Sequence, residues 1–149
     1  MPAEFAKMGI RFQYPENWSV SEDISLAGCR SVTVNSPASA FWTLSIHPRL
    51  TDPTQLVEVA VQVMREEYKE IEGEMVCEEI EGHQLIGQDI NFYCLDLTNT
   101  AWIRSVRTDQ ATYTILCQAE DREFDQIGDV FRAMITSFLA NIGSLAKED

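Results

Sequence analysis

Apolar residues recur at two different spacings along this chain of 149 residues, and the change between the two spacings constrains the fold most. In two long stretches, apolar and polar residues alternate in short segments, which is typical of β-strands with one buried face. After each stretch the apolar residues recur every three or four positions, which predicts an amphipathic helix. The expected order is therefore four strands, a helix, four strands and a helix. This order favours an α+β fold in which a predominantly antiparallel sheet packs against two amphipathic helices, with helices on both sheet faces.

The ends of the predicted elements follow from turn and capping residues. The strands are expected at 10–14, 18–21, 31–35, 42–47, 74–81, 85–97, 101–107 and 111–119, with turns that include Gly82-His83, Thr98-Asn99 and Thr108-Asp109. Strand 85–97 is apolar on both faces, which predicts a central strand covered on both sides.

Capping residues set the limits of the two predicted helices. The first helix is expected to begin with Asp52 as its cap and Pro53 at its first position, with Gln55 closing a capping box. It is expected to run to about Ile71 and to stop near Gly73. The second is expected to start after Asp121 and to end at a glycine cap near Gly143.

The length is that of one ordinary domain, so we expect a single domain over residues 1–149, with residues 1–8 and 144–149 frayed. A chain of this size buries enough apolar surface to need no disulfide or metal for stability. The four cysteines are widely spaced without a Cys-x-x-Cys pair, and no basic segment followed by an apolar run opens the chain. These features predict reduced thiols and a cytoplasmic protein.

The net charge of −13 excludes some partners more firmly than others. It argues against nucleic acid and against anionic membranes, since both require a basic surface. No apolar run approaches the length of a membrane span. A protein partner, and a basic one in particular, is compatible with the charge, but so is simple solubility.

Acidic residues crowd one segment, which gives the most unusual local feature of the sequence. Between residues 66 and 81, only Lys69 opposes Glu66, Glu67, Glu70, Glu72, Glu74, Glu78, Glu79 and Glu81. One hypothesis is a docking face for a basic partner, formed by Glu66, Glu67, Glu70, Glu72 and Glu74. The other interpretation is a solvated helix end and edge strand whose charges prevent edge-to-edge aggregation.

Phe41 stands out because it occupies the polar side of its predicted strand, together with Thr43 and Ser45. It is either an exposed aromatic residue at a partner interface or a residue covered by the second helix or a loop. The sequence leaves these two interpretations open.

No motif for catalysis, phosphate binding, dinucleotide binding or metal binding is present, so we predict no catalytic residue, cofactor or metal. Cys77, Cys94 and Cys117 share strand faces with Met75, Phe92 and Ile115 respectively, which predicts that they line one buried face. The two histidines, His47 on a polar strand face and His83 in a turn, are predicted to be solvated.

Two segments resemble a known fold family. The opening segment Gly9-Ile10-Arg11-Phe12-Gln13-Tyr14-Pro15-Glu16-Asn17-Trp18 is similar to the start of PsbP-like domains, an apolar strand followed by Tyr-Pro-x-Gly-Trp. Asn17 replaces the glycine, a mild departure because asparagine tolerates the same turn geometry. The helix segment 131–138, which ends in Ser137-Phe138, is similar to the last helix of the family. The resemblance implies that Trp18 and Phe138 are core anchors.

The resemblance implies binding rather than chemistry. The family includes a photosystem II subunit, a nuclear-transport protein that binds the Ran GTPase, and Eag-type secretion chaperones, which share a fold but no active site. A fold does not transfer a function, so no functional residue is carried over. We expect a non-enzymatic protein-binding or adaptor domain. The alternatives are a small-molecule carrier with a pocket between helix and sheet, and an enzyme with a cleft that holds His47 or His83 beside a carboxylate.

Overall fold

The computed structural model describes residues 2–25 and 28–148, with residues 143–148 described as backbone alone. The fold class is α+β, as the sequence predicts, and one strand precedes the expected order. The elements are β1 (Pro2–Lys7), β2 (Ile10–Pro15), β3 (Ser19–Ile24), β4 (Arg30–Asn35), β5 (Phe41–His47), α1 (Pro53–Glu67), β6 (Ile71–Ile80), β7 (His83–Cys94), β8 (Leu97–Arg107), β9 (Thr112–Glu120) and α2 (Asp121–Glu148).

The main sheet is antiparallel throughout and has seven strands in the order β3-β4-β5-β9-β8-β7-β6. It consists of two meanders, β3 to β5 and β6 to β9. Pairing of β5 with β9, from Phe41 opposite Gln118 to His47 opposite Thr112, joins the two meanders into one sheet.

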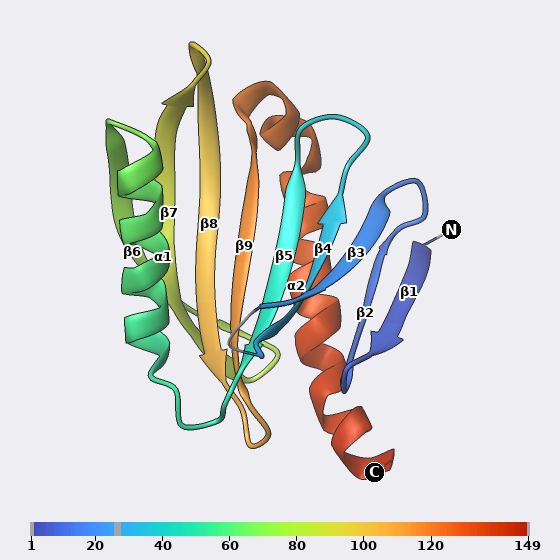
Figure 1. Cartoon of the computed structure of the whole chain (residues 1–149). Coiled ribbons are helices and arrows are strands. Elements are labelled where there is room, and N and C mark those ends of the chain that lie inside the picture. The colour runs from blue at the N-terminus through green and yellow to red at the C-terminus, as the bar shows by residue number, and fades with distance from the viewer. Residues whose placement is uncertain (1, 26–27, 149) are drawn as a thin grey trace.

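The two helices lie on opposite faces of this sheet, as predicted (Figure 1). We call the face that carries α1 the front face and the face that carries α2 the rear face. The larger core lies at the rear, where Trp18 and Phe138 are 8% and 1% exposed and act as the predicted anchors. The smaller front core contains Val57, Val61, Met64, Ile90, Phe92, Ala101 and Ile103.

The prediction that residues 1–8 are frayed is wrong for the described residues 2–8. Residues Pro2–Lys7 form β1, which pairs with β2 in a separate two-stranded sheet. A two-residue turn at Met8 and Gly9, both with positive φ, joins the strands. Consequently β2 does not pair with β3 as the predicted meander requires. Instead it packs against α2, and the Gln13 amide donates a hydrogen bond to Ser137 Oγ at 2.9 Å.

Several predicted turns and strand ends are displaced. The turn after β6 is at Glu81-Gly82, so His83 begins β7, and the turn after β7 is at Leu95-Asp96 rather than Thr98-Asn99. Leucine is not a turn residue by composition, but Leu95 adopts a φ of 53° and is 90% exposed. The strand predicted to be central corresponds to β7, but β7 lies next to the edge strand β6. Strand β9 is the central strand of the sheet instead.

The predicted cap Asp52 and the position of Pro53 are confirmed at the start of α1, but no hydrogen bond of Gln55 closes a capping box among the described residues, and the helix ends earlier than predicted. The Asp52 carboxylate accepts the Thr54 N–H at 3.0 Å, and Pro53 occupies the first turn. The helix ends at Glu67, before the predicted Ile71, because Ile71 instead pairs with Phe92 in the sheet. Tyr68 turns its ring onto Phe92, with ring centroids 4.3 Å apart.

Helix α2 begins at Asp121 itself rather than after it, and the Glu120 carboxylate, not Asp121, accepts the amides of Arg122 and Glu123 at 3.0 and 3.4 Å. The helix also continues beyond the expected glycine cap. Gly143 lies inside the helix, which ends at Glu148, so the backbone of residues 144–148 is helical rather than frayed. None of the described helices is both long enough and apolar enough to cross a membrane.

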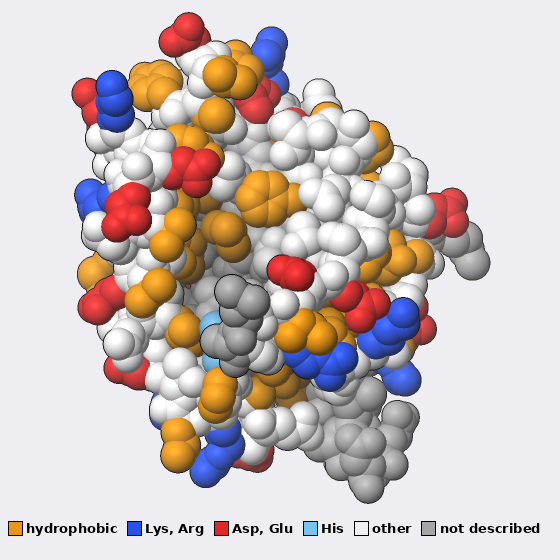
Figure 2. All heavy atoms as spheres, viewed as in Figure 1, with side chains coloured by type: hydrophobic (Ala, Val, Ile, Leu, Met, Phe, Trp, Pro, Cys, Tyr) orange, Lys and Arg blue, Asp and Glu red, His pale blue; other side chains and the backbone are white. Residues whose placement is uncertain are grey.

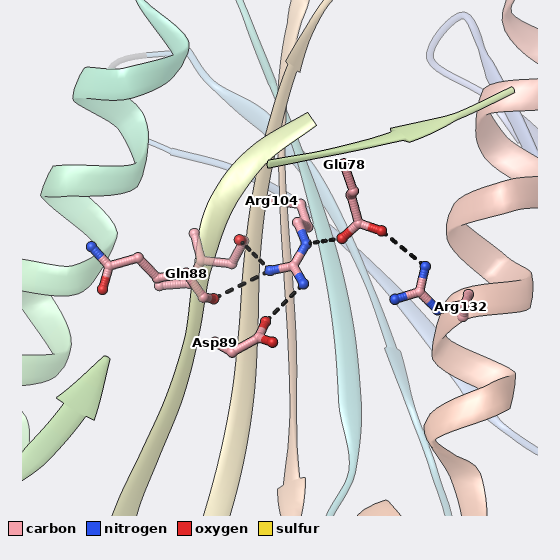
Figure 3. A network of polar contacts seen from close by, with 6 residues as sticks. Glu78, Gln88, Asp89, Arg104 and Arg132 are labelled. Atoms are coloured by element: carbon pink, nitrogen blue, oxygen red, sulfur yellow. Dashed lines mark hydrogen bonds and ion pairs between the residues drawn. The ribbon is translucent and has the colours of Figure 1, made fainter. Parts of the chain in front are cut away.

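A buried arginine links three neighbouring strands at the rear face of the sheet through ion pairs and hydrogen bonds (Figure 3). Arg104 on β8 is 3% exposed, and its Nε donates to Glu78 on β6 at 2.6 Å. Its Nη2 donates to Asp89 on β7 at 2.7 Å, and its Nη1 donates to the carbonyl oxygens of Ile103 and Gln88. All three nitrogens of the guanidinium group are thereby satisfied, which a buried charge requires.

The same network extends to α2 through Glu78. The second carboxylate oxygen of Glu78 accepts Arg132 Nη1 at 2.9 Å, and both guanidinium groups lie over the ring of Trp102. Burial acts to raise the pKa of Glu78, but hydrogen bonds from Arg132 and Arg104 outweigh it and lower the pKa below its ordinary 4.5. Glu78 therefore belongs to the packing between sheet and helix.

The close approach of β7 and β8 gives a test of the register. A Cβ on Gly87 would clash with the carbonyl oxygen of Ile103, which is backbone and cannot move aside, whereas a Cβ on Gly73 would meet the flexible end of Gln88. We expect Gly87→Ala to lower the free energy of unfolding by about 3 kcal/mol, measured by urea denaturation. Gly73→Ala is the matched control and should cost much less. Equal losses would contradict the register of β7 against β8.

The ion-pair network gives a pH prediction. Because the pKa of Glu78 is lower in the folded than in the unfolded state, its stabilisation is complete above pH 4.5 and is lost as the pH falls through the folded value. Glu78→Gln should lower the free energy of unfolding by about 3 kcal/mol at pH 7, since Arg132 loses its charged partner and the buried Arg104 keeps only Asp89. It should also reduce the further loss of stability between pH 5 and pH 2.

The neighbouring exposed residue serves as the control for Glu78. Glu79→Gln removes the same charge from the other face of β6. It should leave the free energy of unfolding at pH 7, and the loss of stability between pH 5 and pH 2, nearly unchanged. If the free energy of unfolding of Glu78→Gln depended on pH as it does in the wild-type protein, Glu78 would not be the source of the pH dependence.

Candidate functional site

Helix α1 covers only half of the front face. Strands lie about 4.8 Å apart and a helix is about 10 Å wide, so one helix cannot cover a seven-stranded sheet. Helix α1 packs on β7, β8 and β9, and the front of β5 and β4 has no helix over it (Figure 1). The boundary between the covered and the uncovered part forms a groove.

This groove, which we call the α1–β5 groove, has a volume of about 500 Å³. Strands β5 and β9 form its floor and α1 forms one wall. Its lining is Phe41, Thr43, Ser45, Ala60, Val63, Met64, Glu67, Tyr68, Thr114, Leu116 and Gln118. Figure 2 shows apolar side chains gathered between α1 and the sheet on this face.

Helix α1 has more apolar surface than the front core uses. Val57, Val61 and Met64 are buried against the sheet, as the helical spacing predicts. Val59 and Val63 form a second pair one turn apart, and each is 53% exposed. Val63 lines the groove, so part of its wall is an apolar helix surface that no described residue covers.

The groove floor combines two apolar side chains with several hydroxyl groups. Phe41 pairs with Gln118, Thr43 with Leu116 and Ser45 with Thr114 across β5 and β9. The Thr43 and Thr33 hydroxyls are hydrogen-bonded to each other at 2.9 Å. Thr114 Oγ1, in contrast, is buried and has no hydrogen-bond partner among the described residues. Such a group is uncommon in folded proteins and calls for an explanation.

Phe41 is positioned by the loop that precedes it. Glu123, in the first turn of α2, accepts the hydroxyl of Ser36 at 2.6 Å and both the hydroxyl and the amide of Ser39 at 2.7 and 2.9 Å. The loop is thereby fixed two residues before β5 begins. Phe41 is half-buried at the groove, so the element beside it is α1, not α2 as one interpretation proposed.

The acidic stretch is divided by the edge of the sheet. Glu67 lines the α1–β5 groove, and Glu66 and Glu70 are exposed near the end of α1. Glu72 and Glu74 share the strand face of Glu78, which contacts α2, so they lie on the rear side. The five predicted docking residues therefore do not form one face. Strand β6 is an edge strand, which agrees with the alternative interpretation for its part of the stretch.

The predicted cysteine face is wrong. Cys117 lies in the rear core, where burial raises the pKa of its thiol strongly. Cys94 packs against the front core, while Cys77 and Met75 are exposed on the edge strand. The parity argument fails because these residues belong to different strands whose shared faces depend on register.

Both histidines are half-buried rather than solvated. Cys29 Sγ lies 3.8 Å from His47 Nδ1 and 3.2 Å from the carbonyl oxygen of Ile46, and burial lowers the pKa of His47. His83 lines a cavity with Asp109, but the two side chains form no hydrogen bond within the described part of the chain. No cluster of three metal-ligating side chains occurs among the described residues. Among the described residues, neither histidine is hydrogen-bonded to a carboxylate, and the partner of His47 is the Cys29 thiol.

Comparison with solved structures identifies the fold. The structure is similar to that of cyanobacterial PsbP from Synechocystis, with a TM-score of 0.60 at 13% sequence identity. The similarity covers 91% of this chain and 90% of the PsbP chain. The fold is PsbP-like. Two further structures resemble it, PA94 of unknown function from Pseudomonas aeruginosa and LpqN from Mycobacterium tuberculosis. PA94 has a TM-score of 0.51 at 12% identity and covers 91% of this chain and 94% of its own.

LpqN, a protein involved in cell envelope biogenesis, has a TM-score of 0.52 at 14% identity over 90% of this chain and 86% of its own. No protein-family model and no curated protein sequence matches. At these identities the similarity shows the PsbP-like fold alone, so the function has to be argued from the site.

The unpartnered hydroxyl of Thr114 gives a test of the groove floor. Thr114→Val removes a buried polar atom that has no partner and keeps the shape of the side chain. We expect the free energy of unfolding to stay the same or to rise by up to about 1 kcal/mol. Thr43→Val is the control, because its hydroxyl is hydrogen-bonded and its loss should destabilise the protein. A clear loss of stability in Thr114→Val would show that the hydroxyl has a partner.

Proposed function

We propose that this PsbP-like domain is a non-enzymatic adaptor that holds a segment of a partner protein in the α1–β5 groove. One observation carries the proposal: Phe41 and Glu67, selected from the sequence for different reasons, line the same groove. They come from β5 and α1, and the fold brings them together.

The character of the groove fits a peptide segment. A soluble protein gains nothing from leaving a contiguous apolar surface in water, and such surfaces mark interaction sites. Val63 offers apolar contacts on the wall. On the floor, Phe41 and Leu116 offer apolar contacts, while Thr43 and Ser45 offer hydroxyl groups.

The charge at one end of the groove indicates the class of partner. Glu66, Glu67 and Glu70 are exposed near the end of α1 and outnumber the two neighbouring basic residues, Arg65 and Lys69. A segment that combines apolar side chains with lysine or arginine fits both features. Charge of this kind mainly speeds and orients association, while burial of the apolar side chains provides affinity.

A non-enzymatic role agrees with the absence of a histidine–carboxylate hydrogen bond and of a metal-ligating cluster in the described residues. The descriptions of the three similar structures name no catalytic activity. The cytoplasmic location remains a prediction.

A second cavity supports the alternative of a small-molecule carrier. It has a volume of about 470 Å³ and lies between α2 and the β1–β2 hairpin, so it fits the predicted place between helix and sheet. Tyr14, Pro15, Val130 and Met134 give it a largely apolar lining. Its size is within the range of small-molecule sites. Copurification of an apolar molecule that contacts these residues would favour the carrier.

Charge reversal on the two sides of the sheet edge tests the adaptor. We expect a tagged protein to recover a stoichiometric partner from its host, identified by mass spectrometry. Glu66→Lys with Glu67→Lys should weaken binding of the purified partner by roughly tenfold or more, measured by calorimetry. Val63→Gln should also weaken it, because it removes apolar wall surface without changing the charge.

The matched control is Glu72→Lys with Glu74→Lys, which changes the charge equally on the rear side of β6. It should retain most of the affinity. If the control pair abolishes binding and the groove variants do not, the partner binds elsewhere and the α1–β5 groove is the wrong site.

A further inference from the structure

A second group of side chains meets at one end of the main sheet. Three connections come together there: the segment between β5 and α1, the turn between β6 and β7, and the turn between β8 and β9. They enclose a cavity of about 440 Å³ that includes Arg49, His83, Arg107 and Asp109. Thr108 and Ile142 of α2 also line it. We call this cavity the arginine cavity.

Within residues 2–25 and 28–142, neither arginine of this cavity forms an ion pair with a carboxylate. The chain has 24 acidic and only 11 basic residues, and Lys7, Arg11, Arg104, Arg122 and Arg132 all form ion pairs. Arg49 has no hydrogen-bond or ion-pair partner among the described residues. Asp109 lines the same cavity but forms no ion pair with either arginine. In so acidic a protein, two guanidinium groups without an ion pair among the described residues in one cavity form a local concentration of positive charge.

The backbone around the cavity is held by hydrogen bonds, and of the two exposed arginines Arg107 also has its guanidinium group held. Arg107 Nη2 donates to the carbonyl oxygen of Thr51 at 2.7 Å, which orients its guanidinium group. Thr112 Oγ1 is 2.9 Å from the carbonyl oxygen of Arg49 and 3.2 Å from that of Thr51. The turn between β8 and β9 is closed by the Thr108 amide, which donates to the Ala111 carbonyl at 2.9 Å. Binding of a ligand therefore costs less side-chain entropy at Arg107, which is already oriented, than at Arg49.

We propose that the arginine cavity binds the phosphate group of a small phosphomonoester. A planar guanidinium group donates two parallel hydrogen bonds to an oxyanion, and two such groups suit the double charge of a phosphate. His83 adds a donor, and Ile142 offers an apolar contact for the organic part. The volume is larger than a phosphate ion needs and lies within the range of small-molecule sites.

The negative charge of the whole protein does not exclude this ligand. At physiological ionic strength charges are screened beyond about 8 Å, so the groups that line the cavity dominate. Among them Asp109 opposes the ligand and weakens the binding without abolishing it. The α1–β5 groove contains none of these residues, so the proposal stands or falls independently of the adaptor function.

The test is a titration of the purified protein at constant ionic strength, followed by two-dimensional NMR, with inorganic phosphate and glycerol 3-phosphate as the probes. We expect saturable shifts of Arg49, His83, Arg107 and Gln110, with tighter binding of glycerol 3-phosphate. Arg49→Gln and Arg107→Gln should each weaken binding roughly tenfold, as loss of a charge-assisted pair does. Asp109→Asn should strengthen binding of inorganic phosphate severalfold, an effect that damage to the fold would not produce.

Arg65→Gln on α1 is the matched control, because it removes one exposed positive charge away from the cavity. It should leave the affinity unchanged, and a thermal melt should show that each variant is folded. Absence of saturation up to roughly 10 mM, or an equal loss in Arg65→Gln, would overturn the site. Equal affinity for the two probes would overturn the phosphomonoester and leave only an oxyanion site.

Discussion

The pairing of β5 with β9 is the contact on which the rest of the structure depends. It connects residues 41–47 with residues 112–118, and without it the two meanders would be separate small sheets. The register of this pairing also determines which side chains of β5 and β9 lie on the same face of the sheet. Phe41, Thr43 and Ser45 reach the same floor as Thr114, Leu116 and Gln118 because of this register, and a slip of one residue would move each set to the other face. The α1–β5 groove is therefore a product of a long-range contact.

Uneven coverage of the sheet explains where binding surface is available. At the rear, α2 and the β1–β2 hairpin bury most apolar residues, and Arg104 enters that core only because Glu78, Asp89 and backbone oxygens satisfy it. At the front, α1 is too narrow to complete the layer. The acidic stretch crosses between these environments, so one of its members stabilises the core while others remain in water. Charge density along a sequence thus says little about charge density on a surface.

Much of the fold could be predicted from local patterns. The alternation at Val32 and Val34, the Asp52-Pro53 helix start and the opening segment that ends in Trp18 were sufficient for the fold class and its PsbP-like character. The Leu95 turn was not predictable, because a leucine with positive φ is tolerated there by the geometry of the hairpin. Strand β1 was missed because it shows only weak alternation.

For the site, Phe41 and Glu67 were selected in advance, but Val63, Thr114 and Arg104 were not, because partners distant in the sequence define their environments. The arginine in the apolar run Ala101-Trp102-Ile103-Arg104 was the one available signal for the ion-pair network.

The β1–β2 hairpin has a consequence for synthesis of the chain on the ribosome. A two-stranded sheet is marginally stable in water by itself, and here Phe5, Ile10 and Phe12 complete their burial in the rear core that includes α2. Strand β5 likewise lacks β9 until nearly the whole chain has been made. The hairpin must therefore wait for α2, and its apolar residues stay exposed while the residues between them are made. In this topology, completion of the first hairpin depends on a helix that follows every strand of the main sheet.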